Sequence, residues 1–365
     1  MAETVHNFHG SDLEQIEAYY GIRREDIIRF GANVNPLGLS ETFRRKMAKE
    51  LDVITSYPDR EYKKLREAIG RYCEVTAPFV LVGNGSTELL SLIIRLCRPG
   101  GALILGPTYS EYERELLLCG RPFQYFILQE AEDFMLDENS LTEKLDATIS
   151  LLILCNPNNP TSSAINIRQM ESVVKTCRKY DILVMVDETY VEFSPDYEQT
   201  SSIPLTSVYD NLVIIRGVSK FFAAPGLRLG YAVTGNTALL QHAHERQNPW
   251  AVSSLADMAG QLLFSDTEHI QKTKELIQSE RRRMWHLFSA MDGIKVYRPQ
   301  ANFMLARILK EGRSGAGLFE NAIRRGLMIR DCSSFFSSDH TYFRFCFMLP
   351  EDNQRLADCV REYLH

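Results

Sequence analysis

The feature that most constrains this fold is an alternation of short apolar runs and helical segments between residues 79 and 233. Their length and their content of branched and aromatic residues predict strands at 79–82, 102–105, 124–128, 151–155, 182–186, 212–215 and 229–233. Apolar strands that alternate with helices favour a mostly parallel sheet covered on both faces. The predicted fold class is therefore α/β, with a large domain built on a seven-stranded sheet.

From residue 251 onward the pattern changes. A long polar helix is expected near 267–288, followed by short strands and two helices that indicate a separate α+β unit. We therefore predict an N-terminal arm with part of a small domain at 1–50 and a large domain at 51–250. An interdomain helix and the rest of the small domain are expected at 251–365.

The composition argues against several classes of protein. A net charge of -6 argues against general affinity for nucleic acid or for an anionic membrane surface. No apolar run approaches the roughly 18 residues of a membrane span, and the first residues lack the pattern of a secretory signal. The eight cysteines include no C-x-x-C pair, which favours buried thiols over disulfides or a metal site. A soluble cytoplasmic protein is expected.

The stretch from Asn211 to Val233 carries the first candidate for chemistry. Lys220 follows a buried strand, and Ser219 and Arg228 lie close to it in sequence. Burial and a neighbouring cation both disfavour the charged form of a lysine and leave a nucleophilic amine. Most lysines in such a position are simply solvated loop residues. Whether Lys220 is a nucleophile therefore depends on the other motifs.

Three polar motifs follow predicted strands. The turn G-N-G-S-T-E at 83–88 opens a helix and so collects free backbone N–H groups, which suits a phosphate. It lacks the third glycine of a dinucleotide-binding fingerprint and the Gly-Lys of a P-loop. The motifs N-P-N-N-P-T at 156–161 and D-E-T-Y at 187–190 lie where open α/β sheets bind ligands, although an acid there can also simply cap a helix.

Taken together, these motifs resemble the pyridoxal-phosphate (PLP) enzymes of fold type I, the aspartate aminotransferase superfamily. The motifs that carry the resemblance occur in the family's order along nearly the whole chain: G-N-G-S-T-E, G-P-T-Y, N-P-N-N-P-T, D-E-T-Y, S-K followed by Arg228, and F-R-F-C-F. The resemblance implies a PLP-dependent enzyme with that fold. An NAD-dependent oxidoreductase or a catalytically silent regulator is disfavoured, because the third glycine is missing and the lysine is intact.

The resemblance implies roles for individual residues. Lys220 matches the lysine that carries the cofactor as a Schiff base and then serves as general base. Asp187 matches the acid that keeps the pyridine nitrogen protonated, and Tyr109 matches the ring stacked on the cofactor. Asn159 and Tyr190 match the donors to its phenolic oxygen.

The cofactor phosphate has its own matching set, which is Gly85, Ser86, Thr87, Ser219 and Arg228. Tyr57 matches a tyrosine that reaches this phosphate from the other subunit. The resemblance therefore implies a homodimer with shared active sites.

Within the superfamily the chain is most similar to threonine-phosphate decarboxylase and histidinol-phosphate aminotransferase. Arg344 matches the arginine that binds the substrate's carboxylate, and Arg330, Asn33 and His9 are candidates for a second anion. The preferred hypothesis is decarboxylation of O-phospho-L-threonine, or O-phospho-L-serine, of the cobalamin-biosynthesis type. The alternative is transamination of histidinol phosphate or a related amine with 2-oxoglutarate and glutamate.

Some positions depart from the family pattern. Ser162 stands where glycine is common, Gly217 stands where a hydroxyl residue is common, and the loop after Phe335 lacks an expected Pro-Gly-Leu. These changes leave cofactor binding credible and leave the choice of substrate open.

Overall fold

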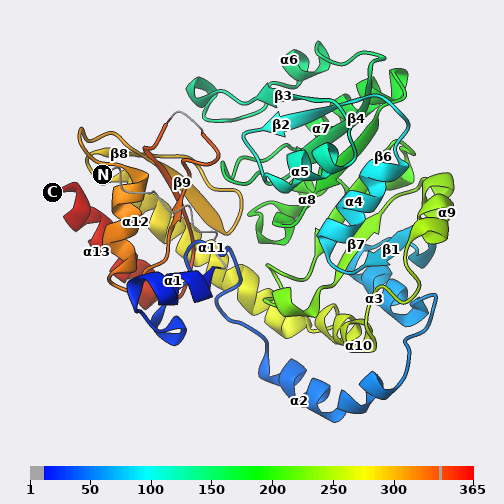
Figure 1. The fold of residues 1–365 in the computed structure, drawn as a ribbon, viewed down its shortest axis with the longest axis horizontal. Coiled ribbons are helices and arrows are strands. Elements are labelled where there is room, and N and C mark those ends of the chain that lie inside the picture. The colour runs from blue at the N-terminus through cyan, green and yellow to red at the C-terminus, as the bar shows by residue number, and fades with distance from the viewer. Residues whose placement is uncertain (1–11, 337–338) are drawn as a thin grey trace.

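The computed structural model describes residues 12–336 and 339–365, which form two β-sheets with helices around them (Figure 1). The larger sheet has seven strands in the order β1-β7-β6-β5-β4-β2-β3, and within it β7 runs antiparallel to both of its neighbours. Its strands are β1 (Val80–Gly83), β2 (Gly101–Gly106), β3 (Phe123–Ile127), β4 (Ile149–Cys155), β5 (Leu183–Asp187), β6 (Leu212–Gly217) and β7 (Gly230–Val233). The seven predicted strands are thus confirmed, with ends that differ by one or two residues.

Helices bury both faces of this sheet. One face carries α4 (Ser86–Leu96), α5 (Glu111–Leu118) and α9 (Thr237–Arg246), and the other carries α3 (Lys63–Cys73), α6 (Glu138–Thr142), α7 (Ile167–Lys179) and α10 (Ser254–Leu263). In β4, Leu151 and Ile153 belong to the apolar cluster that includes α4, α5 and α9. Leu152 and Leu154 belong to the cluster on the other face. Burial of alternate residues on opposite faces explains why the strands other than the edge strand β3 are mostly apolar, and it confirms the predicted fold class.

The smaller sheet is antiparallel, in the order β10-β11-β9-β8. Its strands are β8 (Ile294–Val296), β9 (Phe303–Ile308), β10 (Arg330–Asp331) and β11 (Tyr342–Cys346), and it packs with α12 (Gly315–Ile323) and α13 (Pro350–Leu364). The long helix α11 (Thr267–Ser289) extends from the large sheet's side of the molecule to this unit (Figure 1). The helix α11 therefore connects the two units.

The N-terminal segment docks onto the smaller unit. In α1 (Leu13–Tyr20), Tyr20 donates a hydrogen bond of 2.5 Å to Glu320 of α12. Ile28 then forms a parallel bridge with Leu327. The following loop crosses to the large sheet, where the backbone N–H of Asn35 donates to the carbonyl of Lys220 at 3.0 Å.

The turn before α3 is ordered by Asp59. The residue type of Asp59 suits a helix N-cap, but α3 begins only at Lys63 and its N-cap position is Tyr62. The Asp59 carboxylate instead accepts from the backbone N–H groups of Glu61 at 3.1 Å and Lys63 at 3.0 Å, and so orders the turn that precedes the helix. Two further helices, α2 (Glu41–Lys49) and α8 (Tyr197–Thr200), are short. In the part of the chain that the structure describes, no helix is both long and apolar enough to cross a bilayer.

Candidate active site

Most of the predicted site residues line one cavity of about 330 Å³ at the carboxyl ends of β4, β5 and β6. The predicted residues that line it are Asn33, Ser86, Thr87, Tyr109, Asn159, Asp187, Tyr190, Ser219, Lys220, Arg228, Arg330 and Arg344. They come from the large sheet, from the N-terminal loop and from β10 and β11 of the smaller sheet. The cavity therefore lies between the two units of the molecule.

Lys220 follows β6 and points at the N-terminal loop. Its Nζ donates a hydrogen bond of 2.7 Å to the carbonyl of Ala32. Burial, and to a lesser extent the charge of Arg344, lower the pKa of Lys220 to about 8. A substantial fraction of this amine is therefore neutral near physiological pH, which is the form that attacks an aldehyde.

Asp187 ends β5 and is only 8% exposed. Its carboxylate accepts from the Tyr112 hydroxyl at 2.7 Å, from the Thr189 backbone N–H at 2.9 Å and from the Thr189 hydroxyl at 2.5 Å. Burial raises the pKa of Asp187, while the hydrogen bonds from Thr189 and Tyr112 oppose that rise. The carboxylate is thus held in one orientation, ready to pair with a cationic group.

Arg344 and Asn33, which also line the cavity, each have one polar atom without a hydrogen-bond partner among the described residues. Arg344 donates to Asn159 Oδ1 and, at 3.0 Å, to the carbonyl of Gly31. Asn33 Nδ2 donates to the Tyr190 hydroxyl at 3.5 Å. Arg344 Nε and Asn33 Oδ1 are buried and have no partner among the described residues. Such orphaned groups are costly in a finished structure and indicate a place for a polar ligand.

The start of α4 forms a close-fitting cradle. Gly85 has a φ of 84°, and a Cβ there would lie 2.6 Å from Arg228 Nη2. A Cβ on Gly230 of β7 would lie 2.4 Å from the backbone nitrogen of Ser86. Both glycines therefore let the backbone and a guanidinium approach the free N–H groups of Ser86 and Thr87, the arrangement that binds a phosphate.

The cavity is strongly cationic. Lys220, Arg228 and Arg344 take part in none of the ion pairs formed among residues 12–336 and 339–365. Arg330 donates to the Ser334 hydroxyl at 2.9 Å. Asp187 is the one acid among the described residues that line the cavity. Uncompensated cations in a half-buried space favour ligands with more than one anionic group.

Three predicted residues lie elsewhere. Gly85 does not line the cavity but touches Arg228, as described above. Tyr57 is 81% exposed and packs on Trp250, with ring centroids 4.9 Å apart, outside the cavity of its own chain. His9 lies outside the described residues.

Sequence reasoning missed several residues that the fold brings to the site. Tyr112 and Thr189 orient Asp187, and the Ala32 carbonyl receives the Lys220 amine. Arg29 and Phe335 also line the cavity. Tyr112 lies in the first turn of α5, three residues after Tyr109, which precedes that helix. No local signal points to a backbone carbonyl such as that of Ala32.

Comparison with known proteins gives consistent results. The sequence profile of the family "Aminotransferase class I and II" matches residues 25–360. The threonine-phosphate decarboxylase of Salmonella typhimurium is 30% identical, over 98% of this chain and 96% of its own. The histidinol-phosphate aminotransferase of Methanopyrus kandleri is also 30% identical, over 97% of this chain and 93% of its own.

A solved structure agrees with these relatives. The histidinol-phosphate aminotransferase of Clostridium acetobutylicum superposes with a TM-score of 0.86 at 29% identity, covering 92% of this chain and 98% of that one. The profile match spans nearly the whole chain, including both sheets and the cavity between them. The chain therefore belongs to the class I and II aminotransferase family of PLP-dependent enzymes.

Proposed function

We propose that this enzyme decarboxylates O-phospho-L-threonine, or O-phospho-L-serine, to the corresponding amino-alcohol phosphate. The observation that carries the proposal is the presence of Arg330 and Arg344 in the same cavity, in addition to Arg228 in the cradle at α4. A phosphorylated amino acid presents two anionic groups, a carboxylate and a phosphate, and each needs a fixed cation. The relatives named as threonine-phosphate decarboxylase support this choice.

The residues present fit PLP. The cradle of Ser86, Thr87 and Arg228 would hold its phosphate, and the oriented carboxylate of Asp187 would pair with its pyridine nitrogen. Lys220 would bind its aldehyde, and Tyr109 would cover its ring. When bound, PLP supplies an electron sink for the bond that breaks at the substrate's Cα.

The side chains around the cofactor then decide which bond breaks. Arg344, fixed by Asn159 and the Gly31 carbonyl, would hold one anion of the substrate, and Arg330 would hold the other. Two fixed cations would set the orientation of the substrate's carboxylate, and that orientation would favour loss of carbon dioxide over loss of the Cα proton. With a pKa of about 8, Lys220 can hold or release a proton near neutral pH, and in its protonated form it would donate that proton to Cα.

A second candidate is transamination of a phosphorylated amine. The likeness to histidinol-phosphate aminotransferases, in sequence and in three dimensions, favours it. The deciding experiment incubates the holoenzyme with O-phosphothreonine, O-phosphoserine and, together with 2-oxoglutarate, histidinol phosphate. Carbon dioxide with an amino-alcohol phosphate supports our proposal, and a keto product without carbon dioxide overturns it. Lys220→Ala should abolish either reaction while leaving the fold intact, as judged by circular dichroism.

The same proposal makes the active unit a homodimer. Four exposed apolar side chains support it: Leu51 and Ile54 in the short helical segment Leu51–Thr55, Tyr57 after it, and Trp250. Large exposed apolar side chains that touch one another on a surface are typical of an interaction site, and Tyr57 and Trp250 are such a pair. In the proposed dimer Tyr57 contacts the cofactor phosphate of the partner subunit.

A further inference from the structure

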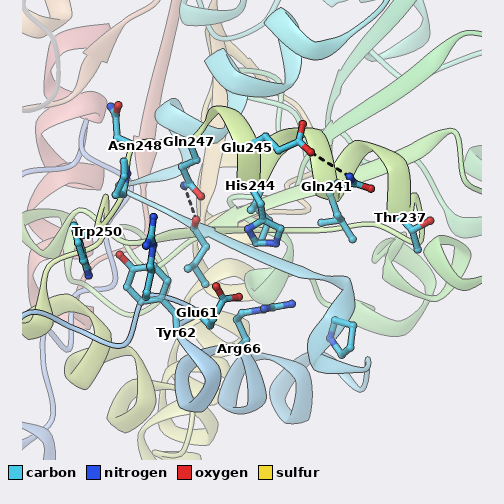
Figure 2. Close-up of a pocket in the computed structure, with 16 residues that line it drawn as sticks. Glu61, Tyr62, Arg66, Thr237, Gln241, His244, Glu245, Gln247, Asn248 and Trp250 are labelled. Carbon is cyan, nitrogen blue, oxygen red and sulfur yellow. Dashed lines mark hydrogen bonds between the residues drawn. The ribbon is translucent and has the colours of Figure 1, made fainter.

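A second cavity, the α3–α9 pocket, lies on the large domain away from the Lys220 cavity, and none of the described residues that line the two is shared. It has a volume of about 540 Å³ and lies between the start of α3, the helix α9 and the loop 247–250 (Figure 2). Leu81 and Val82 of β1 also line it. Gln247 fixes the loop by donating a hydrogen bond of 2.8 Å to the carbonyl of Val82. The pocket is therefore built from ordered elements.

Arg66 is the charged group that remains unsatisfied in this pocket. Its Nε is buried and has no acceptor among the described residues, and none of the ion pairs in that part of the chain includes it. Burial lowers the pKa of Arg66, although a guanidinium stays protonated at neutral pH. A buried N–H without an acceptor is costly, so an oxyanion that accepts from it would stabilise this wall.

His244 faces the same space from α9. Figure 2 shows Glu61, Arg66 and His244 directed toward a common region between the two helices. Burial and the charge of Arg66 lower the pKa of His244, so its imidazole is neutral at pH 7. None of the hydrogen bonds within residues 12–336 and 339–365 uses this ring, which leaves one ring N–H free to donate.

Two acids, Glu61 and Glu245, also line the pocket, but neither forms an ion pair with Arg66 in the described part of the chain. The Glu61 side chain is exposed, so water and salt screen its charge. Glu245 accepts a hydrogen bond of 3.1 Å from Gln241 on the same helix, a pair drawn at the far end of Figure 2. Arg60 adds a further cation at the rim, above the ring of Trp250 at 5.5 Å.

We propose that the α3–α9 pocket binds a small molecule through a phosphate or carboxylate group held by Arg66 and His244. The amide side chains of Gln241, Gln247 and Asn248 surround the remaining volume and suit a polar ligand. Trp250 forms part of the wall, so a ligand in the pocket lies beside the indole ring. The pocket shares no described lining residue with the Lys220 cavity, so the proposal concerns a second site.

The test uses Trp250 as a local reporter. The chain has two tryptophans, so Trp285→Phe leaves Trp250 as the one source of indole emission. Holoenzyme carrying this change is titrated with inorganic phosphate, with sodium chloride adjusted to keep the ionic strength constant. We expect a saturable change in emission. Arg66→Gln should raise the midpoint about tenfold or more, because a charge-assisted hydrogen bond to the anion is lost.

Arg71→Gln is the matched control, since it makes the same change of charge on an exposed position of the same helix. Its titration should coincide with that of the Trp285→Phe protein. The proposal is overturned if no saturable change occurs, or if Arg66→Gln and Arg71→Gln shift the midpoint equally. Because the readout is independent of turnover, a negative result here leaves the decarboxylase proposal untouched, and the reverse also holds.

Discussion

At the scale of the residue, the environment of Lys220 makes a prediction about cofactor capture. Its pKa of about 8 lies below the ordinary lysine value of 10.5, so the neutral amine becomes the majority form above pH 8. The rate at which the apoprotein binds the PLP aldehyde should therefore rise from pH 6 and level off above about pH 8. Stopped-flow absorbance measures this rate. A rate that continued to rise to pH 10 would show that the amine keeps an ordinary pKa.

Tyr112 makes a second prediction at this scale. Its hydroxyl donates to Asp187 at 2.7 Å and helps to keep that buried carboxylate ionised. Tyr112→Phe should raise the pKa of Asp187 and weaken PLP binding about fivefold at neutral pH. The loss of PLP affinity on acidification, which we call the acid limb, should then begin at a higher pH. Equilibrium binding of PLP between pH 5 and 8 measures both effects.

Tyr125→Phe is the matched control for Tyr112→Phe. Tyr125 also donates a hydrogen bond of 2.7 Å to a carboxylate, that of Glu113, but at an exposed position away from the cavity. It should leave the affinity for PLP and its pH dependence unchanged. An acid limb that stayed in place in Tyr112→Phe would refute the role assigned to this hydroxyl.

Residues whose chemistry lies in their type could be selected from the sequence as candidates. Lys220, Asp187 and Arg344 stand in motifs whose spacing is informative, and the fold brings them to one cavity. Residues that act through these groups were missed, because a tyrosine such as Tyr112 has an ordinary packing role in most helices. Whether a hydroxyl meets a carboxylate depends on tertiary geometry, which no local pattern specifies.

At the scale of the element, the large sheet was predictable because its strands, apart from the edge strand β3, are buried on both faces and are bounded by polar turns. Helix starts were less predictable. Asp59 has the residue type of a helix cap, yet the turn at Tyr62 adopts a φ of 48° and delays α3 to Lys63. The choice between a cap and a preceding turn depends on the packing of Tyr62, whose hydroxyl accepts from the backbone N–H of Val252 at 3.1 Å.

The packing of β7 against α4 gives a prediction at this scale. Gly230→Ala would place a Cβ 2.4 Å from the Ser86 nitrogen, so the start of α4 must move and the cradle must open. We expect PLP affinity to fall about tenfold or more, since phosphate contacts depend on the precise direction of those N–H groups. Equilibrium binding of PLP to the folded apoprotein measures the change.

Gly226→Ala is the control for this experiment. It lies close to Arg228 in sequence, but a Cβ there meets nothing within 4 Å. Its affinity for PLP should equal that of the unchanged protein. Normal PLP affinity in Gly230→Ala would mean that the contact between β7 and α4 is not needed for the cradle.

At the scale of the whole molecule, the site depends on contacts between distant parts of the chain. The backbone of Ile28 pairs with Gly326 and Met328, and this pairing brings Ala32 and Asn33 over Lys220. Residues almost 300 positions apart in sequence thus build one cavity wall. Such pairing could not be derived from local periodicity, because a short extended segment near the N-terminus is compatible with many partners.

The last prediction concerns the proposed dimer and uses two inactive variants. Tyr57→Asp should repel the cofactor phosphate in the partner subunit, and Lys220→Ala should remove the essential amine of its own subunit. In a mixed dimer, the site that has Lys220 receives Tyr57 from the Lys220→Ala subunit and is intact. Random exchange makes half of the dimers mixed, each with one such site, so mixing should restore about a quarter of the wild-type activity.

Sedimentation first establishes that each variant is folded and dimeric. Mixing Lys220→Ala with a protein that carries both substitutions is the control, and it should restore nothing, because no subunit then has the amine. If mixing the two single variants also restored nothing, although their subunits exchange, Tyr57 would have no role in a neighbouring site. Its 81% exposure and its contact with Trp250 would then reflect a surface without catalytic function.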